Sequence, residues 1–195
     1  MLKTADLKKI RKSMEKELDA KRYEHTLGVA YTAAALAMCN DVDPVKAETA
    51  GLLHDCAKCF SDDKKISVCR KNNMEINSVE SRNPYLLHAK AGYCIAKNKF
   101  DIEDQDILNA ILNHTTGRPG MSTLEKIIYI ADYIEPSRKQ APNLSEVRKL
   151  AFQNLDQALL KILTDILSYL ESGGGEIDPL TKETYDYYAD LLAKC

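Results

Sequence analysis

Four histidines and two aspartates give this chain side chains that could bind metal ions. The histidines are His25, His54, His88 and His114. Asp55 follows His54 directly, and Asp132 lies in the apolar segment IIYIADYIEP. A carboxylate among isoleucines is costly to bury unless its charge is balanced. A metal cation balances it directly, and four imidazoles with two carboxylates are enough ligands for two ions with open positions for water and substrate.

Each of these residues also has an ordinary explanation. A single histidine beside apolar residues is more often a hydrogen-bonded core or capping residue, and a buried aspartate often caps a helix. Taken together, the residues favour a metal site, because otherwise every histidine in the chain would be incidental. Adjacent helical residues point about 100° apart. We therefore expect His54 and Asp55 at the end of a helix, or the two Asp55 oxygens directed at two ions.

Two further patterns adjoin these residues. Cys56 and Cys59 have the spacing of a redox pair or half a zinc site, but no second such pair exists and the other cysteines are scattered. We expect both to be small packing residues beside the site, with redox sensitivity as the alternative. His114 opens the loop Thr115-Thr116-Gly117, whose backbone N–H groups suit an anion, although an ordinary helix-to-loop turn also explains it.

Helices are the elements that must position these residues. Leu7, Ile10, Met14 and Leu18 recur at helical spacing. Aspartate followed by proline marks helix starts at 43–44 and 178–179, and Ser122 with Glu125 forms a capping box. Beyond the first helix, the expected helices lie at about 23–39, 43–55, 61–73, from 83, around 107–111, 122–132, 145–170 and 178–192.

The fold class predicted from this pattern is all-α. No convincing strand alternation and no internal repeat interrupts the helical segments. We expect a single helical-bundle domain at 1–172, and a glycine-rich break with a C-terminal helix at 173–195 that packs on the same domain. A length of 195 residues suits one domain.

Composition narrows the partners and the compartment. The net charge of −2 argues against a broad nucleic-acid-binding surface. No apolar run is long enough to span a bilayer, and the charged N-terminal segment lacks the apolar core of a secretory signal. We therefore expect a cytoplasmic protein with reduced cysteines, without nucleic-acid or membrane partners. The sequence leaves a monomer and a homodimer open.

At four segments the chain resembles the HD-domain metal-dependent phosphohydrolases. More narrowly, it resembles their bacterial YqeK-type branch, the symmetrical bis(5'-nucleosyl)-tetraphosphatases, which hydrolyse diadenosine tetraphosphate. The matching segments, between Arg22 and Arg138, are RYEHTLGVA, AGLLHDCAK, NPYLLHAKAG and NHTTGRPGMSTLEKIIYIADYIEPSR. A bare His-Asp pair is weak evidence, whereas the ordered set of all six residues is strong.

The resemblance implies a helical HD domain with a dinuclear metal centre. One ion would be held by His25, His54, Asp55 and Asp132, and Asp55 would bridge to a second ion held by His88 and His114. The family favours iron, so we expect two iron ions, although manganese or other divalent ions also suit these ligands. The resemblance further implies that a metal-activated hydroxide cleaves diadenosine tetraphosphate at its central bond and gives two ADP.

Cationic residues near the motifs would contact the phosphates. We expect Asp55, Lys58 and Arg138 to act in catalysis. The expected substrate contacts are Lys58, Lys90, Thr115, Thr116, Gly117 and Arg138. Arg118 is a further candidate, for which a surface charge is the better explanation. Tyr31, Tyr85, Tyr133 and the tail tyrosines could stack on a base but are more often core residues.

Two other functions remain open at this stage. One is another HD-type nucleotidase or phosphodiesterase, which only substrate turnover separates from the first. The other is a non-catalytic nucleotide-binding regulator, which would be expected to have lost metal ligands. All six ligands are present here, so an enzyme is favoured.

Overall fold

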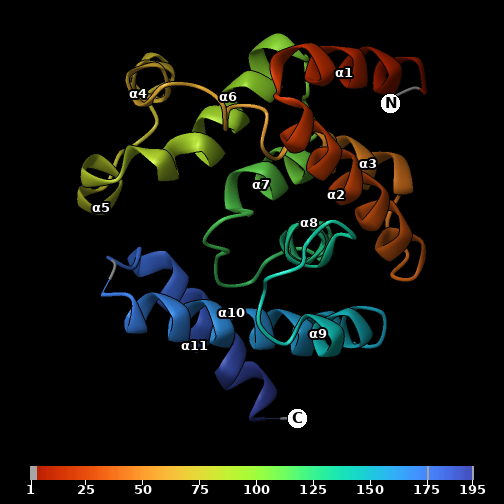
Figure 1. Cartoon of the computed structure of the whole chain (residues 1–195), viewed down its shortest axis with the longest axis vertical. Coiled ribbons are helices and arrows are strands. Elements are labelled where there is room, and N and C mark those ends of the chain that lie inside the picture. Colours follow the sequence, from red (N-terminus) through yellow and green to blue (C-terminus); the bar gives the residue numbers. More distant parts are fainter. Residues whose placement is uncertain (1–3, 175, 195) are drawn as a thin grey trace.

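The computed structural model describes residues 4–174 and 176–194, and these residues contain helices but no strands (Figure 1). The predicted all-α class is therefore confirmed. The elements are α1 (Thr4–Glu17), α2 (Ala20–Met38), α3 (Pro44–Leu53), α4 (Asp62–Lys71), α5 (Ser78–Arg82), a 3-10 helix η1 (Pro84–Leu87), α6 (His88–Lys99), α7 (Gln105–Asn113), α8 (Thr123–Ile134), α9 (Leu144–Ala151), α10 (Leu155–Ser172) and α11 (Pro179–Leu192).

Side-chain caps define the predicted helix starts. The Asp43 side chain accepts a hydrogen bond from the Val45 N–H at the start of α3. At α8, Ser122 and Glu125 form both hydrogen bonds of the capping box. Each cap satisfies backbone N–H groups that the first helical turn leaves without partners. The start of α8 fixes the register of that helix, and with it the position of Asp132.

Helix α8 lies at the centre of the molecule. In Figure 1 it is seen nearly end-on, with α2 and α3 on one side and α9 and α10 on the other. Contacts join α8 to α2, α7 and α10. Its apolar residues are almost completely buried, among them Ile127, Ile128 and Ile130. Burial of this face against three neighbours is the main reason that α8 holds a fixed position in the core.

Helices α2 and α3 pack closely enough that a glycine is needed between them. A Cβ atom on Gly51 would lie 2.7 Å from Cα of Ala30, a distance that side chains do not tolerate. Only a residue without a side chain fits where two helix backbones approach this closely. Gly51 is one turn before His54, so the close contact also fixes the end of α3 against α2.

Two sequence predictions differ from the structure. The helix predicted at 145–170 is interrupted: α9 ends at Ala151, and Asn154 caps the start of α10 by accepting a hydrogen bond from the Gln157 N–H. The apolar period continues across this break, so periodicity alone could not reveal it. The segment from 83 begins as the 3-10 helix η1, and the short helix α5 before it was not predicted.

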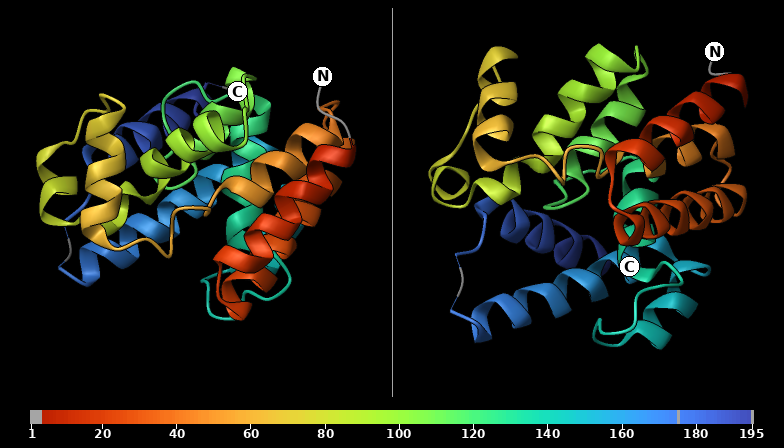
Figure 2. Two further views of the ribbon diagram at one scale, coloured as in Figure 1. Left: turned by 90° about the horizontal axis from the view of Figure 1, so that it is seen from above. Right: turned by 45° about the horizontal axis from the view of Figure 1, so that its top comes forward.

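The C-terminal helix lies against α10 (Figure 2). Tyr188 of α11 is buried, and its hydroxyl accepts a hydrogen bond from the Met121 N–H at 3.0 Å. Gly175, part of the predicted break, and Cys195 lie outside the described residues. Among the described helices, none is long and apolar enough to cross a membrane.

Candidate metal centre

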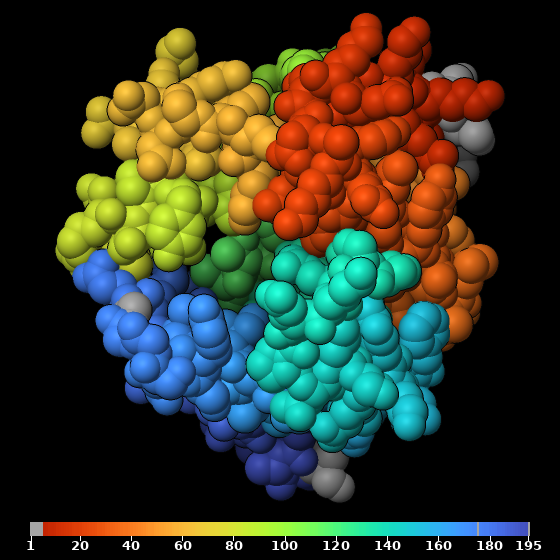
Figure 3. Space-filling model, in the orientation of Figure 1, coloured from red at the N-terminus to blue at the C-terminus, as the bar shows by residue number. Residues whose placement is uncertain are grey.

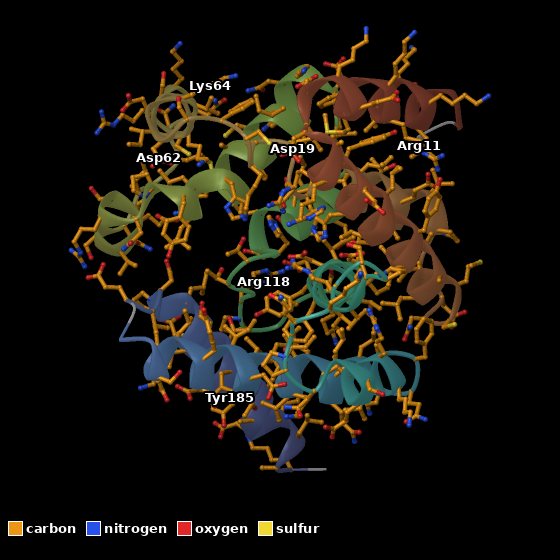
Figure 4. The ribbon with its side chains drawn as sticks, in the orientation of Figure 1. Arg11, Asp19, Asp62, Lys64, Arg118 and Tyr185 are labelled. Atoms are coloured by element: carbon orange, nitrogen blue, oxygen red, sulfur yellow. The ribbon has the colours of Figure 1, made fainter. Side chains whose placement is uncertain are left out.

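The structure brings the six predicted metal ligands together in the interior. His54 and His114 cap the C-termini of α3 and α7, and His88 is the first residue of α6. His25 lies in α2, Asp55 in the turn after α3, and Asp132 near the end of α8. In Figure 4, polar side chains crowd the space between α2, α7 and α8. The expectation that His54 and Asp55 stand at a helix end matches this geometry.

The distances divide the cluster into two groups that share Asp55. Its Oδ1 atom lies 3.4 Å from Nε2 of His88 and 3.5 Å from Nε2 of His114. Its Oδ2 atom lies 3.7 Å from Nε2 of His54. The ligand atoms of His25, His54 and Asp55 lie within 4.8 Å of one another, as do those of Asp55, His88 and His114. Both groups have the size of a metal site.

Hydrogen bonds fix the orientation of all four imidazole rings. Nδ1 of His54 lies 2.6 Å from the carbonyl of Gly51, and His88 and His114 make the same contact with the carbonyl three residues earlier. A carbonyl only accepts, so each Nδ1 carries the proton and each Nε2 presents a lone pair. In His25, Nδ1 contacts the Glu135 carboxylate at 3.0 Å. Metal-binding histidines typically donate their second ring N–H to a carbonyl or carboxylate in this way.

The cluster also contains buried polar atoms without hydrogen-bond partners, which is the observation that tests the fit of a metal. Nε2 of His25, Nε2 of His54 and Oδ1 of Asp55 are such atoms among the described residues. Nε2 of His25 lies 3.1 Å from Oδ1 of Asp132 without hydrogen-bond geometry. Buried atoms of this kind are costly unless something binds them. Divalent ions satisfy nitrogen lone pairs and carboxylate oxygens together, so the residues fit the metal.

Burial sets the charge of these groups. It lowers the pKa of His54 to about 4 and that of His88 to about 3, so both rings are neutral at pH 7, as metal ligands must be. Burial alone would raise the pKa of Asp55, but His54, His114 and Lys58 outweigh it and hold that pKa well below its ordinary value. His54 and His88 therefore present neutral nitrogens, and Asp55 presents an ionised carboxylate.

Two residues of the centre were missed by the sequence reasoning. Arg22 donates from Nη1 to Oδ2 of Asp55 at 2.9 Å. Glu135 is almost fully buried and binds His25, the Ser137 N–H and the Ser137 hydroxyl. Both lie inside segments that match the family, RYEH and IEPSR, and Arg22 precedes His25 by about one helical turn. That spacing could have identified Arg22 from the sequence.

Three of the predicted substrate contacts lie beside the cluster. Lys58, Thr115 and Arg138 line a hollow of about 220 Å³ together with His88 and His114. Nζ of Lys58 lies 3.0 Å from Nε2 of His88. Arg138 contacts Oδ1 of Asp132 at 2.8 Å. Both cations therefore lie directly beside the candidate metal ligands.

The structure does not bring the other predicted contacts into that hollow. Lys90 donates to the Glu75 carbonyl and to Glu80, and it lines neither of the two hollows described for this chain. Gly117 has a φ of +66° and packs against Thr184, as a turn requires, and the Thr116 hydroxyl donates to the Gly117 carbonyl. Thr116 and Gly117 therefore have structural explanations here.

Arg118 and Cys56 have structural roles. Arg118 donates twice to the buried carboxylate of Glu125, so it is held in an ion pair and is not the free surface charge that the sequence favoured. Cys56 is buried and contacts the Gly92 carbonyl, as expected of a packing residue. Cys59 is exposed, so its predicted packing role is wrong. The turn after α3 points that side chain outward.

The cluster is reached from one face of the molecule. In Figure 3 the green segment at the end of α7 is recessed between the lime, teal and blue segments. A second hollow, of about 980 Å³, adjoins the first and runs from the start of α2 along residues 135–142 to α10. Asp19, labelled in Figure 4, marks its edge at α2. The centre is therefore buried but open to small molecules on this side.

Comparisons with known proteins identify the family of this chain. A model of the HD domain matches residues 22–137. The symmetrical bis(5'-nucleosyl)-tetraphosphatase of Bacillus subtilis (strain 168) is 39% identical over 89% of this chain and 92% of its own length. The protein of the same name from Halalkalibacterium halodurans is 41% identical over 85% of this chain and 87% of its own length.

A solved structure has the same fold. It is a crystal structure from Clostridium acetobutylicum, described as a "predicted HD superfamily hydrolase involved in NAD metabolism". It superposes with a TM-score of 0.91 at 44% sequence identity, and the match covers 94% of this chain and 97% of that chain. The likeness therefore extends over nearly all of both chains.

Proposed function

Because this chain belongs to the HD domain family and, within it, to the symmetrical bis(5'-nucleosyl)-tetraphosphatases, we propose that it hydrolyses diadenosine tetraphosphate to two ADP. The observation that carries the proposal is the buried cluster at the base of the two hollows. There, four oriented imidazoles and Asp55 present ligand atoms beside Lys58 and Arg138. Such a set suits a metal-dependent phosphohydrolase and gives the non-catalytic alternative no support.

The metal ligands would act as two groups that share Asp55. His25, His54 and Asp132 complete one group, and His88 and His114 the other. When bound, divalent ions lower the pKa of water and take up charge on phosphoryl oxygens. The donors are imidazole nitrogens and carboxylates, which suit iron and manganese. We propose two iron ions, with manganese as the substitute.

The cations of the site would hold the polyphosphate. Arg138 offers a planar guanidinium that fits two phosphate oxygens at once, and Lys58 offers a point charge. Arg22 and Thr115 lie close enough to the cluster to contribute further donors. Together they would orient one of the two central phosphorus atoms toward an attacking water.

The reaction is a hydrolysis at the central bond. The oxygen of water bonds to one central phosphorus atom, and the bond from that atom to the bridging oxygen breaks. The bridging oxygen leaves on the other half as a terminal phosphate oxygen, and a proton is released. Two ADP molecules result, and no protein nucleophile is consumed.

Product analysis tests the proposal. Purified protein loaded with iron or manganese should convert diadenosine tetraphosphate to ADP alone, as resolved by chromatography. Formation of ATP plus AMP would contradict the symmetrical reaction. A panel of cyclic and mononucleotides covers other HD-type activities, and a faster turnover of one of these would replace the proposed substrate.

The partners, location and oligomeric state of the protein are also proposals. We propose a nucleotide substrate and no nucleic-acid partner, since the net charge is −2. We further propose a cytoplasmic location, and either a monomer or a homodimer. Chromatography with light scattering measures the oligomeric state, and a nucleic-acid binding assay checks the absence of that partner.

A further inference from the structure

The two hollows beside the metal cluster differ about fourfold in volume. The smaller measures about 220 Å³ and the larger about 980 Å³. They adjoin each other, because four residues line both: Tyr133, Arg138, Ala141 and Ile166. A substrate with two identical halves therefore meets two unequal spaces at the centre.

Size limits what each hollow can enclose. Pockets that hold small organic ligands measure about 300–1,000 Å³. The smaller hollow falls below this range. Lys58, Thr115 and two imidazoles in its lining suit phosphate groups, and Tyr129, Ile162 and Ile166 form its apolar part. The larger hollow lies at the top of the range and has room for a nucleoside with its phosphates.

The two ends of the larger hollow differ in charge. At α2 it is lined by Arg22 and His25, next to the cluster, and Arg138 lies at the boundary with the smaller hollow. Arg22 and Arg138 would attract phosphate, and Asp19 and Glu24 also line this end. At α10 the hollow is lined by Ile166, Tyr169 and Asp165, so its lining changes from mostly charged to largely apolar and aromatic along its length.

The end at α10 suits a nucleoside better than a phosphate. Tyr169 is 72% exposed, so its ring is accessible to a ligand in this hollow. Asp165 also lines this end and is largely buried. Its Oδ1 accepts from Asn143 and Lys161, and its Oδ2 has no hydrogen-bond partner among the described residues. A carboxylate repels phosphate but accepts from the amine and hydroxyl groups of a nucleoside.

We infer that the protein binds only one nucleoside of its substrate, in the larger hollow between Tyr133, Ile166 and Tyr169, and holds the other half by its phosphates. The inference rests on the proposed function. Because the nucleoside end and the metal cluster are fixed relative to each other, the distance between them selects the bond that is cleaved. The cut follows the second phosphate from the bound nucleoside, whatever the far end of the substrate carries.

A substrate with one nucleoside tests this directly. Adenosine 5'-tetraphosphate should be cleaved to ADP and pyrophosphate: water adds to one of the two central phosphorus atoms, and the bridging oxygen leaves on the other product. We expect its kcat/KM to lie within about tenfold of that for diadenosine tetraphosphate, since tenfold is only about 1.4 kcal/mol. Products are resolved by chromatography, with both substrates assayed on the same metal-loaded enzyme.

A surface variant tests the residue assignment. Tyr169→Ala should raise KM for both substrates by about tenfold and leave kcat nearly unchanged, as expected when base stacking is lost equally from ground and transition states. Tyr31→Ala is the matched control, because Tyr31 is also exposed but lines neither hollow. It should leave both constants unchanged.

Three results would overturn the inference while the proposed function stands. The first is cleavage of diadenosine tetraphosphate to ADP with a kcat/KM more than about tenfold lower for the single-nucleoside substrate, which would show that both nucleosides are bound. The second is release of ATP plus phosphate, or of AMP plus triphosphate, from adenosine tetraphosphate. The third is a Tyr169→Ala enzyme that matches the Tyr31→Ala control. Failure to cleave diadenosine tetraphosphate at all would refute the proposed function and the inference with it.

Discussion

Glu135 should control metal binding although it is not a ligand. Its Oε1 atom accepts from Nδ1 of His25 at 3.0 Å and from the Ser137 hydroxyl at 2.5 Å, and its Oε2 accepts from the Ser137 N–H at 2.6 Å. Burial raises the pKa of Glu135, but these hydrogen bonds outweigh burial and lower it, so the side chain is ionised at neutral pH. Because both carboxylate oxygens of Glu135 act only as acceptors, the His25 proton stays on Nδ1 and Nε2 remains free.

Glu135→Gln replaces one of these acceptors with a donor. If the amide NH2 faces Ser137, two N–H groups point at each other across a hydrogen-bond distance. If it faces His25, the ring must move its proton to Nε2, where it blocks the metal. Loss of such an outer contact lowers metal affinity by roughly 10–100-fold. The unpaired buried group should also lower the free energy of unfolding by about 1–3 kcal/mol.

Competition with a chelator under anaerobic conditions measures metal affinity, and urea denaturation of the metal-free protein measures stability. The control is Glu80→Gln, which changes another buried glutamate that accepts from Lys90 and the Asn77 N–H and contacts no histidine. It should alter stability alone. Wild-type affinity in Glu135→Gln, or an equal loss of affinity in Glu80→Gln, would refute the reasoning.

Four other outcomes are expected. Gly51→Ala should cost about 1–3 kcal/mol in urea denaturation because its Cβ meets the α2 backbone at 2.7 Å, whereas Gly173→Ala, whose nearest atom lies at 3.4 Å, should cost less than about 1 kcal/mol. Arg118→Met should destabilise the protein by about 1–3 kcal/mol, since the buried carboxylate of Glu125 keeps its hydrogen bonds from Asn113 and Ser122 but loses its cationic partner, and should leave KM unchanged in steady-state assays. Chelation should lower Tm, and added iron or manganese should restore it, as seen by differential scanning fluorimetry. The metal-free protein should lose stability as pH falls from 6.5 toward 4. The reason is that the imidazoles of His54 and His88 take up protons in the unfolded chain but not in the buried site. A urea midpoint that rises as the pH falls over this range would contradict this.

The helices could be predicted mostly because their signals are local. Asp43 with Pro44, and Ser122 with Glu125, cap helices through contacts that span two or three residues. The break between α9 and α10 escaped prediction because Asn154 interrupts the helix without interrupting the apolar period. Local chemistry ended the helix there, and the pattern of buried residues continued.

The candidate metal ligands could also be named from the sequence, since their types and order along the chain mark the family. The partners of these ligands could not. His25 meets Glu135 across 110 positions of sequence, and Arg22 meets Asp55 across 33. Lys90 is the opposite case. It follows His88 by two residues, but it binds Glu80 and lies outside both hollows.

The sequence by itself therefore determined the helical class, most helix starts and the set of candidate metal ligands. These depend on residue types and on contacts between near neighbours. Only the tertiary structure decided which cations face the centre, which carboxylate orients His25, and that one hollow is far larger than the other. Such features depend on how α2, α8 and α10 pack, because side chains from distant segments meet only after those helices have taken their places.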